Sequence, residues 1–201
     1  SIEQQGMHAF AGDMGLTSSL VPQTDCMESQ GCDAFPNGGT PEVSDDVADF
    51  VTFYASSLAV PMRRNMDDPA VKQGAERFNA LGCASCHTPR QRTAADAPRP
   101  ALAGQEIWPY SDLLLHDLGD ALADHRSEFQ ADGREWRTPP LWGIGLAQTV
   151  NPRAGFLHDG RARTLEEAIL WHGGEAESAT QGYRALPADQ RAELIRFLES
   201  L

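Results

Sequence analysis

Residues 83–87 form the pentapeptide Cys83-Ala84-Ser85-Cys86-His87, a C-x-x-C-H pattern. Two thiols at this spacing can add to the two vinyl groups of one haem, and the adjacent imidazole then lies under the iron. The pattern therefore predicts one covalent haem c, with His87 as an axial ligand. A thioredoxin-like redox pair needs no histidine after its second cysteine, and a zinc site needs a second pair of ligands, so both alternatives fit less well.

A predicted helix leads directly into this motif. Asp68-Pro69 combines a capping carboxylate with proline at the first helical position. Gly82 follows the last apolar residue of the repeat and is expected to end the helix, which delivers Cys83 to the haem. The predicted buried face consists of Val71, Ala75, Phe78 and Leu81.

Helical patterns also occur elsewhere along the chain. Ser44 is a candidate cap for a helix that ends before Pro61, and a short helix is expected within residues 111–124. Thr164-Leu165-Glu166-Glu167 is a capping box for a helix ending at His172, and the last helix covers about 188–201. The predicted buried stripe of the first of these helices consists of Val47, Phe50, Val51, Tyr54 and Leu58.

No convincing strand pattern is present, so we expect an all-α fold with long irregular loops. Residues 61–201 are predicted to form a cytochrome c-type haem domain. Residues 1–60 are predicted to be an arm plus one helix that packs on this domain, and the turn-rich stretch 1–43 is expected to be irregular.

Charge and hydropathy exclude several functions. The 201 residues include 16 basic and 29 acidic side chains, a net charge of −13, which disfavours nucleic-acid binding. Apolar runs are only a few residues long, so no membrane span is predicted. The acidity aids solubility, and steering of a small basic redox partner is the alternative.

Cysteine usage points to an oxidising compartment. Haem c is attached outside the reducing cytosol, so a periplasmic or otherwise exported location is expected. Cys26 and Cys32 fit this setting if they form a disulfide across a short loop rich in Gly, Pro and Asn. Two free thiols are the alternative.

Several segments match known haem proteins in order. The chain from Asp68 onward resembles the C-terminal haem domain of bacterial di-haem cytochrome c peroxidases and of the di-haem enzyme that matures methylamine dehydrogenase. The matching segments are residues 83–87, Arg137-Thr138-Pro139-Pro140-Leu141-Trp142, Phe156-Leu157-His158-Asp159-Gly160 and Thr164-Leu165-Glu166-Glu167-Ala168.

A closer resemblance is to the branch called di-haem oxidoreductases, or "thiol oxidoreductases". It rests on Asn37-Gly38-Gly39, Phe53-Tyr54 with Leu58-Ala59-Val60-Pro61, Asp112-Leu113-Leu114-Leu115-His116-Asp117, Arg134-Glu135-Trp136-Arg137-Thr138-Pro139-Pro140 and Trp171-His172-Gly173-Gly174-Glu175-Ala176. That family has two C-x-x-C-H motifs and this chain has one, so the resemblance implies the C-terminal half of a longer protein whose N-terminal haem domain is the missing partner.

The resemblance implies an electron-transfer role for this chain, as the relay haem domain of a peroxidase-like oxidoreductase. A free-standing monohaem cytochrome carrier is the alternative, although the chain is about twice as long as a small carrier. A dithiol that exchanges with other thiols is a third hypothesis. It conflicts with His87, since thioether-bonded sulfurs cannot exchange.

His172 is the predicted sixth ligand. In the peroxidase relatives the matching residue before a glycine is a distal Met, and in the maturation enzyme it is a Tyr. A helix-terminal His stabilised by the helix dipole is the alternative role. With His87 and His172 both bound, the iron has no free site for peroxide, and the haem stores and relays single electrons.

Three further residues are predicted near the haem. The resemblance places His158 close to it, as a group that reaches a propionate or a backbone carbonyl. Trp142 lies in a segment that is expected to run beside the haem, and it is expected to pack in the haem pocket. Arg137 is a candidate partner for a propionate, and the alternative is that it is a solvated surface residue. His116 is interpreted as a hydrogen-bonded loop residue or, less readily, as a ligand.

Overall fold

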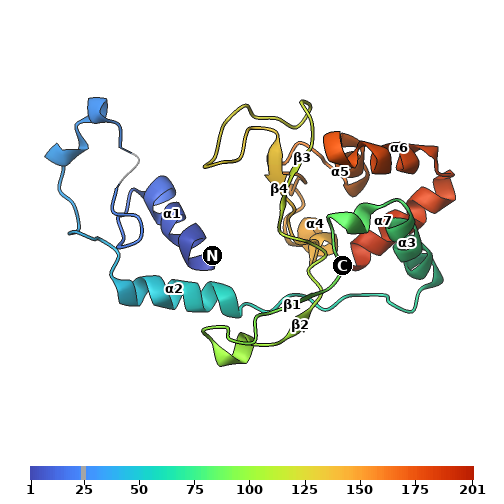
Figure 1. Cartoon of the computed structure of the whole chain (residues 1–201), viewed down its shortest axis with the longest axis horizontal. Coiled ribbons are helices and arrows are strands. Elements are labelled where there is room, and N and C mark those ends of the chain that lie inside the picture. Colours follow the sequence, from blue (N-terminus) through green and yellow to red (C-terminus); the bar gives the residue numbers. More distant parts are fainter. Residues whose placement is uncertain (24–25) are drawn as a thin grey trace. The chain divides into compact units, whose positions relative to one another are not determined.

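The computed structural model describes residues 1–23 and 26–201, which divide into two compact units, Ser1–Ala59 and Val60–Leu201. The described residues contain seven α-helices and two small antiparallel sheets, so the all-α prediction is confirmed at this coarse level (Figure 1). None of the described helices has both the length and the apolar character needed to span a bilayer.

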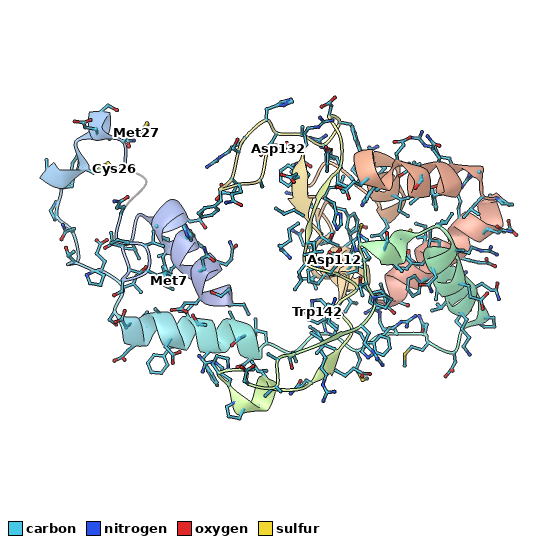
Figure 2. All side chains as sticks on the ribbon, in the orientation of Figure 1. Met7, Cys26, Met27, Asp112, Asp132 and Trp142 are labelled. Carbon is cyan, nitrogen blue, oxygen red and sulfur yellow. A yellow bond between two sulfur atoms is a disulfide. The ribbon has the colours of Figure 1, made fainter. Side chains whose placement is uncertain are left out.

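The first unit contains a helix that the sequence did not predict. Helix α1 (Ile2–Met14) occupies part of the stretch expected to be irregular, beginning where the Ser1 hydroxyl accepts a hydrogen bond from the Gln4 amide and ending at Gly15 with φ 70°. Only Met7 and Ala11 are buried in it, and Met7 lies between α1 and α2 (Figure 2). Such a narrow apolar stripe gives little helical periodicity, which is why the pattern was not recognised.

Helix α2 (Asp45–Ser57) begins as predicted, because the Ser44 hydroxyl accepts a hydrogen bond from the Val47 amide. Its predicted buried stripe is wrong, since Ala48 is the buried residue that packs against α1. Small Ala48 lets the two helices approach closely, and Val51 is the one member of the predicted stripe that is half-buried. The exposed members of the predicted stripe are Val47, Phe50, Tyr54 and Leu58.

The Cys26–Cys32 pair also lies in the first unit. The structure joins the two residues by a disulfide, with their Cα atoms 6.4 Å apart. Of the two alternatives for this pair, the bridge is the one present.

The core of the second unit is formed by α3 (Pro69–Ala80) and α7 (Ala188–Ser200), which lie side by side (Figure 1). Phe78 of α3 meets Phe197 of α7 with ring centroids 5.2 Å apart. Gly74 allows this close crossing, because a Cβ there would overlap the carbonyl oxygen of Glu193 and lie 2.6 Å from Cβ of Phe197. The buried residues of this core are Val71, Phe78, Tyr110, Leu141, Phe156, Ala162, Leu165, Tyr183, Leu194, Phe197, Leu198 and Leu201.

Most predicted helix ends in this unit agree with the structure. An Asp68 side-chain oxygen accepts a hydrogen bond from the Ala70 amide at the start of α3. Helix α5 (Leu165–Trp171) is capped by Thr164 and ends at His172, as the capping box indicated. Two further helices, α4 (Ala147–Val150) and α6 (Glu177–Ala185), were missed. Helix α6 lacks a side-chain cap and buries only Thr180 and Tyr183, so its sequence gives a weak signal.

The predicted helix within 111–124 is wrong. Strand β3 (Leu115–Asp117) pairs there with β4 (Glu135–Arg137), aligning His116 with Trp136. Leu113 has φ 61°, and carboxylates of Asp112 and Asp117 accept hydrogen bonds from the amides of Leu114 and Gly119. These local bonds offer the backbone an alternative to the helix. The second sheet pairs β1 (Gln91–Arg92) with β2 (Glu106–Ile107).

Substituting Gly74→Ala tests the close crossing of α3 and α7. The added methyl group meets backbone, which cannot move cheaply, so we expect the free energy of unfolding to fall by about 2–3 kcal/mol. Urea titration followed by circular dichroism measures this loss. The exposed neighbour substitution Gln73→Ala serves as the control and should change stability by less than about 0.5 kcal/mol. Equal stability of the two variants would contradict this account of the crossing.

Candidate haem site

The two motif cysteines lie on a 3₁₀ turn, η3 (Cys83–Ser85), directly after α3. Gly82 has φ 84° and redirects the chain between the two elements. Both thiols are free and partly buried, and Cys83 packs against the core. Burial raises the pKa of Cys83 to about 11 and also raises the pKa of Cys86. Both groups are therefore protonated at neutral pH, which disfavours thiol exchange because the thiolate is the reactive form.

The His87 ring is fixed by the segment that starts at Tyr110. Its Nδ1 lies 3.1 Å from the Tyr110 carbonyl oxygen, and because a carbonyl only accepts, Nδ1 carries the proton. Tyr110 has φ 55° and is anchored by its buried ring, which meets Phe78 and Phe197 edge-on. The following residues stay close to the motif, since the Asp112 amide donates to the Cys86 carbonyl at 2.8 Å.

His172 is fixed from the end of α5. Its Nδ1 lies 2.6 Å from the Ala168 carbonyl oxygen, one turn back along the same helix. Thr180 of α6 is 1% exposed, and its hydroxyl lies 3.0 Å from the Ile169 carbonyl oxygen and 2.7 Å from that of His172. The helix that sequence reasoning missed thus supplies a buried hydroxyl that holds the end of α5.

The two imidazole rings lie close together. The ring centroids of His87 and His172 are 6.5 Å apart, with an interplanar angle of 53°. If one metal ion were bound between the two rings, two metal–nitrogen bonds of about 2 Å, with each nitrogen about 1 Å from its ring centre, would separate the ring centres by about 6 Å. Because each Nδ1 donates to a carbonyl, each Nε2 keeps its lone pair.

Both rings are also neutral at pH 7. Burial lowers the pKa of His87 to about 4, and burial likewise lowers the pKa of His172. Neutral imidazole is the form that binds a metal. The donor set therefore fits one iron held between two nitrogens.

Residues elsewhere in the second unit have the chemistry that the remainder of a haem requires. Leu113, Leu114 and Leu115 are each about half exposed or more, although large apolar side chains prefer burial. Within the described part of the chain, the buried Trp136 Nε1 has no hydrogen-bond partner. Arg137 is exposed, and no ion pair of its own is found among the described residues. The three leucines match the apolar ring of a haem. The Trp136 N–H and the Arg137 guanidinium match its acidic propionates.

The other predicted site residues lie as follows. His158 stacks on Trp136 with centroids 3.5 Å apart, and its Nε2 lies 4.0 Å from an Asp159 oxygen. Trp142, which Figure 2 labels, is half-buried and follows buried Leu141 in the sequence. Arg137 ends strand β4. Among residues 1–23 and 26–201, no hydrogen bond, ion pair or ring contact is found between these three residues and the imidazoles of His87 and His172, so their predicted roles remain predictions.

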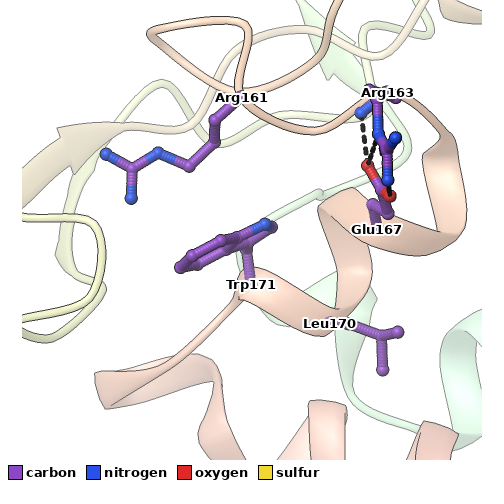
Figure 3. A pocket seen from close by; sticks show the side chains of 5 residues that line it. All are labelled: Arg161, Arg163, Glu167, Leu170 and Trp171. Atoms are coloured by element: carbon purple, nitrogen blue, oxygen red, sulfur yellow. Dashed lines mark hydrogen bonds and ion pairs between the residues drawn. The ribbon is translucent and has the colours of Figure 1, made fainter.

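An open depression lies beside Trp171, the residue before His172 (Figure 3). The Arg161 guanidinium lies 5.0 Å from the Trp171 ring centroid and also bonds Asp159. The Arg163 guanidinium is bound to Glu167 at 2.7 Å. Both cations are thus already paired, which leaves little charge for an anionic ligand here.

The sequence analysis interpreted His116 as a hydrogen-bonded loop residue but did not identify its partners. His116 Nε2 lies 2.9 Å from an Asp112 oxygen, and its Nδ1 lies 2.9 Å from a Glu175 oxygen. The Sγ atom of Cys86 is within 4.8 Å of the ligand atoms of Asp112 and His116. The spacing of Asp112 and His116 was a signal, but Glu175 is 59 positions from His116 and no local pattern connects them.

Comparison with known families identifies one match. A sequence model described as "Di-haem oxidoreductase, putative peroxidase" matches residues 1–201. A search of curated proteins found no match.

The buried Thr180 hydroxyl gives a test of how His172 is held. Thr180→Val keeps the volume but leaves the carbonyls of Ile169 and His172 without this donor, so stability should fall by about 1–3 kcal/mol. Thermal unfolding of the purified chain measures the effect. Thr149→Val, at an exposed position of α4, is the matched control and should change little. Similar unfolding temperatures for both variants would argue against a role for Thr180.

Proposed function

This chain belongs to the di-haem oxidoreductase family, and we propose that it binds one covalent haem c and transfers electrons. The observation that carries the proposal is the pair of neutral imidazoles with ring centroids 6.5 Å apart. When bound, the haem exchanges single electrons between its ferric and ferrous states.

Several residues have a proposed role in holding this haem. Cys83 and Cys86 form the two thioether bonds, and His87 and His172 hold the iron through their Nε2 atoms. The supporting observations are the two free, adjacent thiols and the two Nδ1–carbonyl hydrogen bonds. The residues proposed to cover the ring, or to reach its propionates, are Leu113, Leu114, Leu115, Trp136, Arg137, Trp142 and His158.

Electron relay suits this site better than peroxide chemistry. A second imidazole blocks the position at which an oxidant would bind, and two imidazoles give a lower potential than a His/Met pair. The family is di-haem and this chain has one C-x-x-C-H motif. We therefore propose that residues 1–201 are the C-terminal relay domain of a longer, exported peroxidase-like protein, whose second haem lies on another domain and receives electrons that originate from a small donor.

Haem content and spin state test this function. Chain produced in a host that attaches haem c should carry one haem by mass and by pyridine haemochrome. The ferric form should be low-spin by electron paramagnetic resonance, and the ferrous form should bind carbon monoxide slowly. A colourless chain of unmodified mass would overturn the proposal.

Substitution of the predicted sixth ligand gives a sharper result. His172→Ala should convert the ferric haem to high spin and speed carbon monoxide binding, because the position opposite His87 becomes open. His172→Met should stay low-spin while raising the midpoint potential by on the order of 100 mV. Optical spectra and redox titration measure both changes.

His158→Ala is the comparison variant, because it removes a ring that stacks on Trp136 and is proposed to contact the haem but not its iron. This variant should keep the low-spin spectrum of the original chain. If it becomes high-spin while His172→Ala does not, the assignment of the sixth ligand is wrong.

A further inference from the structure

His116 lies between two carboxylates. One comes from the segment that is bonded to Cys86, and the other comes from the segment that follows His172. Its Nε2 is 2.9 Å from Asp112 and its Nδ1 is 2.9 Å from Glu175. The side chains of His116 and Asp112 are only 17% and 13% exposed, whereas that of Glu175 is 55% exposed. The geometry therefore joins a largely buried pair to a partly exposed carboxylate.

This arrangement favours the protonated imidazole. A neutral ring has one N–H, so one of its nitrogens would present a lone pair to a carboxylate, whereas imidazolium donates on both sides. Hydrogen bonding to Glu175, and then to Asp112, raises the pKa of His116 despite the opposing effect of burial. His116 correspondingly lowers the pKa of Glu175. Below the raised pKa of His116, the three groups thus form a charged unit.

Glu175 connects this unit to the His172 side. It lies three residues after His172, and its second oxygen accepts a hydrogen bond from the Asp117 amide at 2.9 Å. Gly173 and Gly174, which lie between His172 and Glu175, allow their backbone to pack directly against the backbone of Asp117 and Leu118. A Cβ on Gly174 would overlap the Asp117 carbonyl oxygen, and one on Gly173 would lie 3.0 Å from the Leu118 carbonyl oxygen.

Asp112 connects the same unit to the His87 side. Its amide donates to the Cys86 carbonyl at 2.8 Å, and one side-chain oxygen accepts from the Leu114 amide. The contacts therefore run without a break from the residue before His87 to the segment that follows His172.

We propose that Asp112, His116 and Glu175 form a proton-dependent clamp that positions His172 opposite His87. Glu175 is a positioning residue in this clamp, because it touches the segment after His172 and not the iron. The haem part of the inference rests on the proposed function. Loss of the His116 proton leaves a lone pair facing one carboxylate, so the clamp weakens and His172 is held less firmly.

The sign of the pH effect follows from the raised pKa of His116. The clamp is fully formed below about pH 6.5, the ordinary value for histidine, and is lost as pH rises through the higher folded-state value. Other titratable or charged groups face this region. They are Cys86, His87, Asp117, Asp120, Arg134, Glu135, His158 and Glu177.

Carbon monoxide binding to the ferrous haem protein reports how firmly His172 is held. In the unsubstituted chain the binding rate should be low at pH 6 and should rise with the deprotonation of His116, which an NMR titration of its ring follows. Glu175→Gln and His116→Gln should each raise the rate at pH 6 by at least about fivefold and flatten its pH dependence. Glu177→Gln is the matched control. It removes the same charge from a residue whose side chain bonds Gln181, and should behave like the unsubstituted chain.

The outcomes separate the clamp from the haem assignment. If the haem is low-spin and both test variants keep the original rate and pH profile, the clamp is wrong and the proposed function stands. If the chain carries no low-spin haem, the proposed function fails. Amide hydrogen exchange at Asp117, which donates to Glu175, and at Ala176, which donates to the Gly173 carbonyl, then decides the clamp. Glu175→Gln should speed that exchange, and an unchanged rate would overturn the clamp.

Discussion

The second unit is organised around two hydrogen bonds from imidazole nitrogens to backbone carbonyls. The Tyr110 and Ala168 carbonyls fix the tautomers of His87 and His172, so the Nε2 atom of each ring keeps its lone pair, and the two ring centroids are 6.5 Å apart. A carbonyl holds a ring in this way only if its own backbone is immobile. The aromatic core beneath Tyr110, and the Thr180 hydroxyl at the end of α5, provide that rigidity. The core of the second unit therefore holds the His87 and His172 rings in fixed positions.

Local signals predicted a large part of this arrangement. Asp68, Thr164 and Gly82 determine helix ends through bonds within a few residues, so capping chemistry located α3, α5 and the motif turn from the sequence. His172 was predicted from a family resemblance. The structure places it beside His87. The two histidines are 85 positions apart in the sequence, so no local pattern could show that their rings are close.

What the sequence did not reveal depends on contacts between distant segments. The stretch around Leu113 had a helical apolar pattern, yet its carboxylates bond nearby amides and its strand pairs with Trp136. Glu175 meets His116 only because Gly173 and Gly174 let two backbones touch. The buried side of α2 was misjudged for a related reason, since small Ala48 is the residue of α2 that is buried in the cluster with Met7 of α1. Periodicity identifies apolar residues but does not say which neighbour will cover them.

The burial of Cys83 also bears on the order of events during biogenesis. A thiol adds to a vinyl group through its thiolate, and in the finished fold Cys83 packs on the core with its proton firmly held. Under the proposed function, the thioether bond at Cys83 would therefore form more readily in a chain in which this side chain is not yet packed on the core. Cofactor insertion would then precede compaction, and the porphyrin would act as a template on which the polypeptide finishes folding.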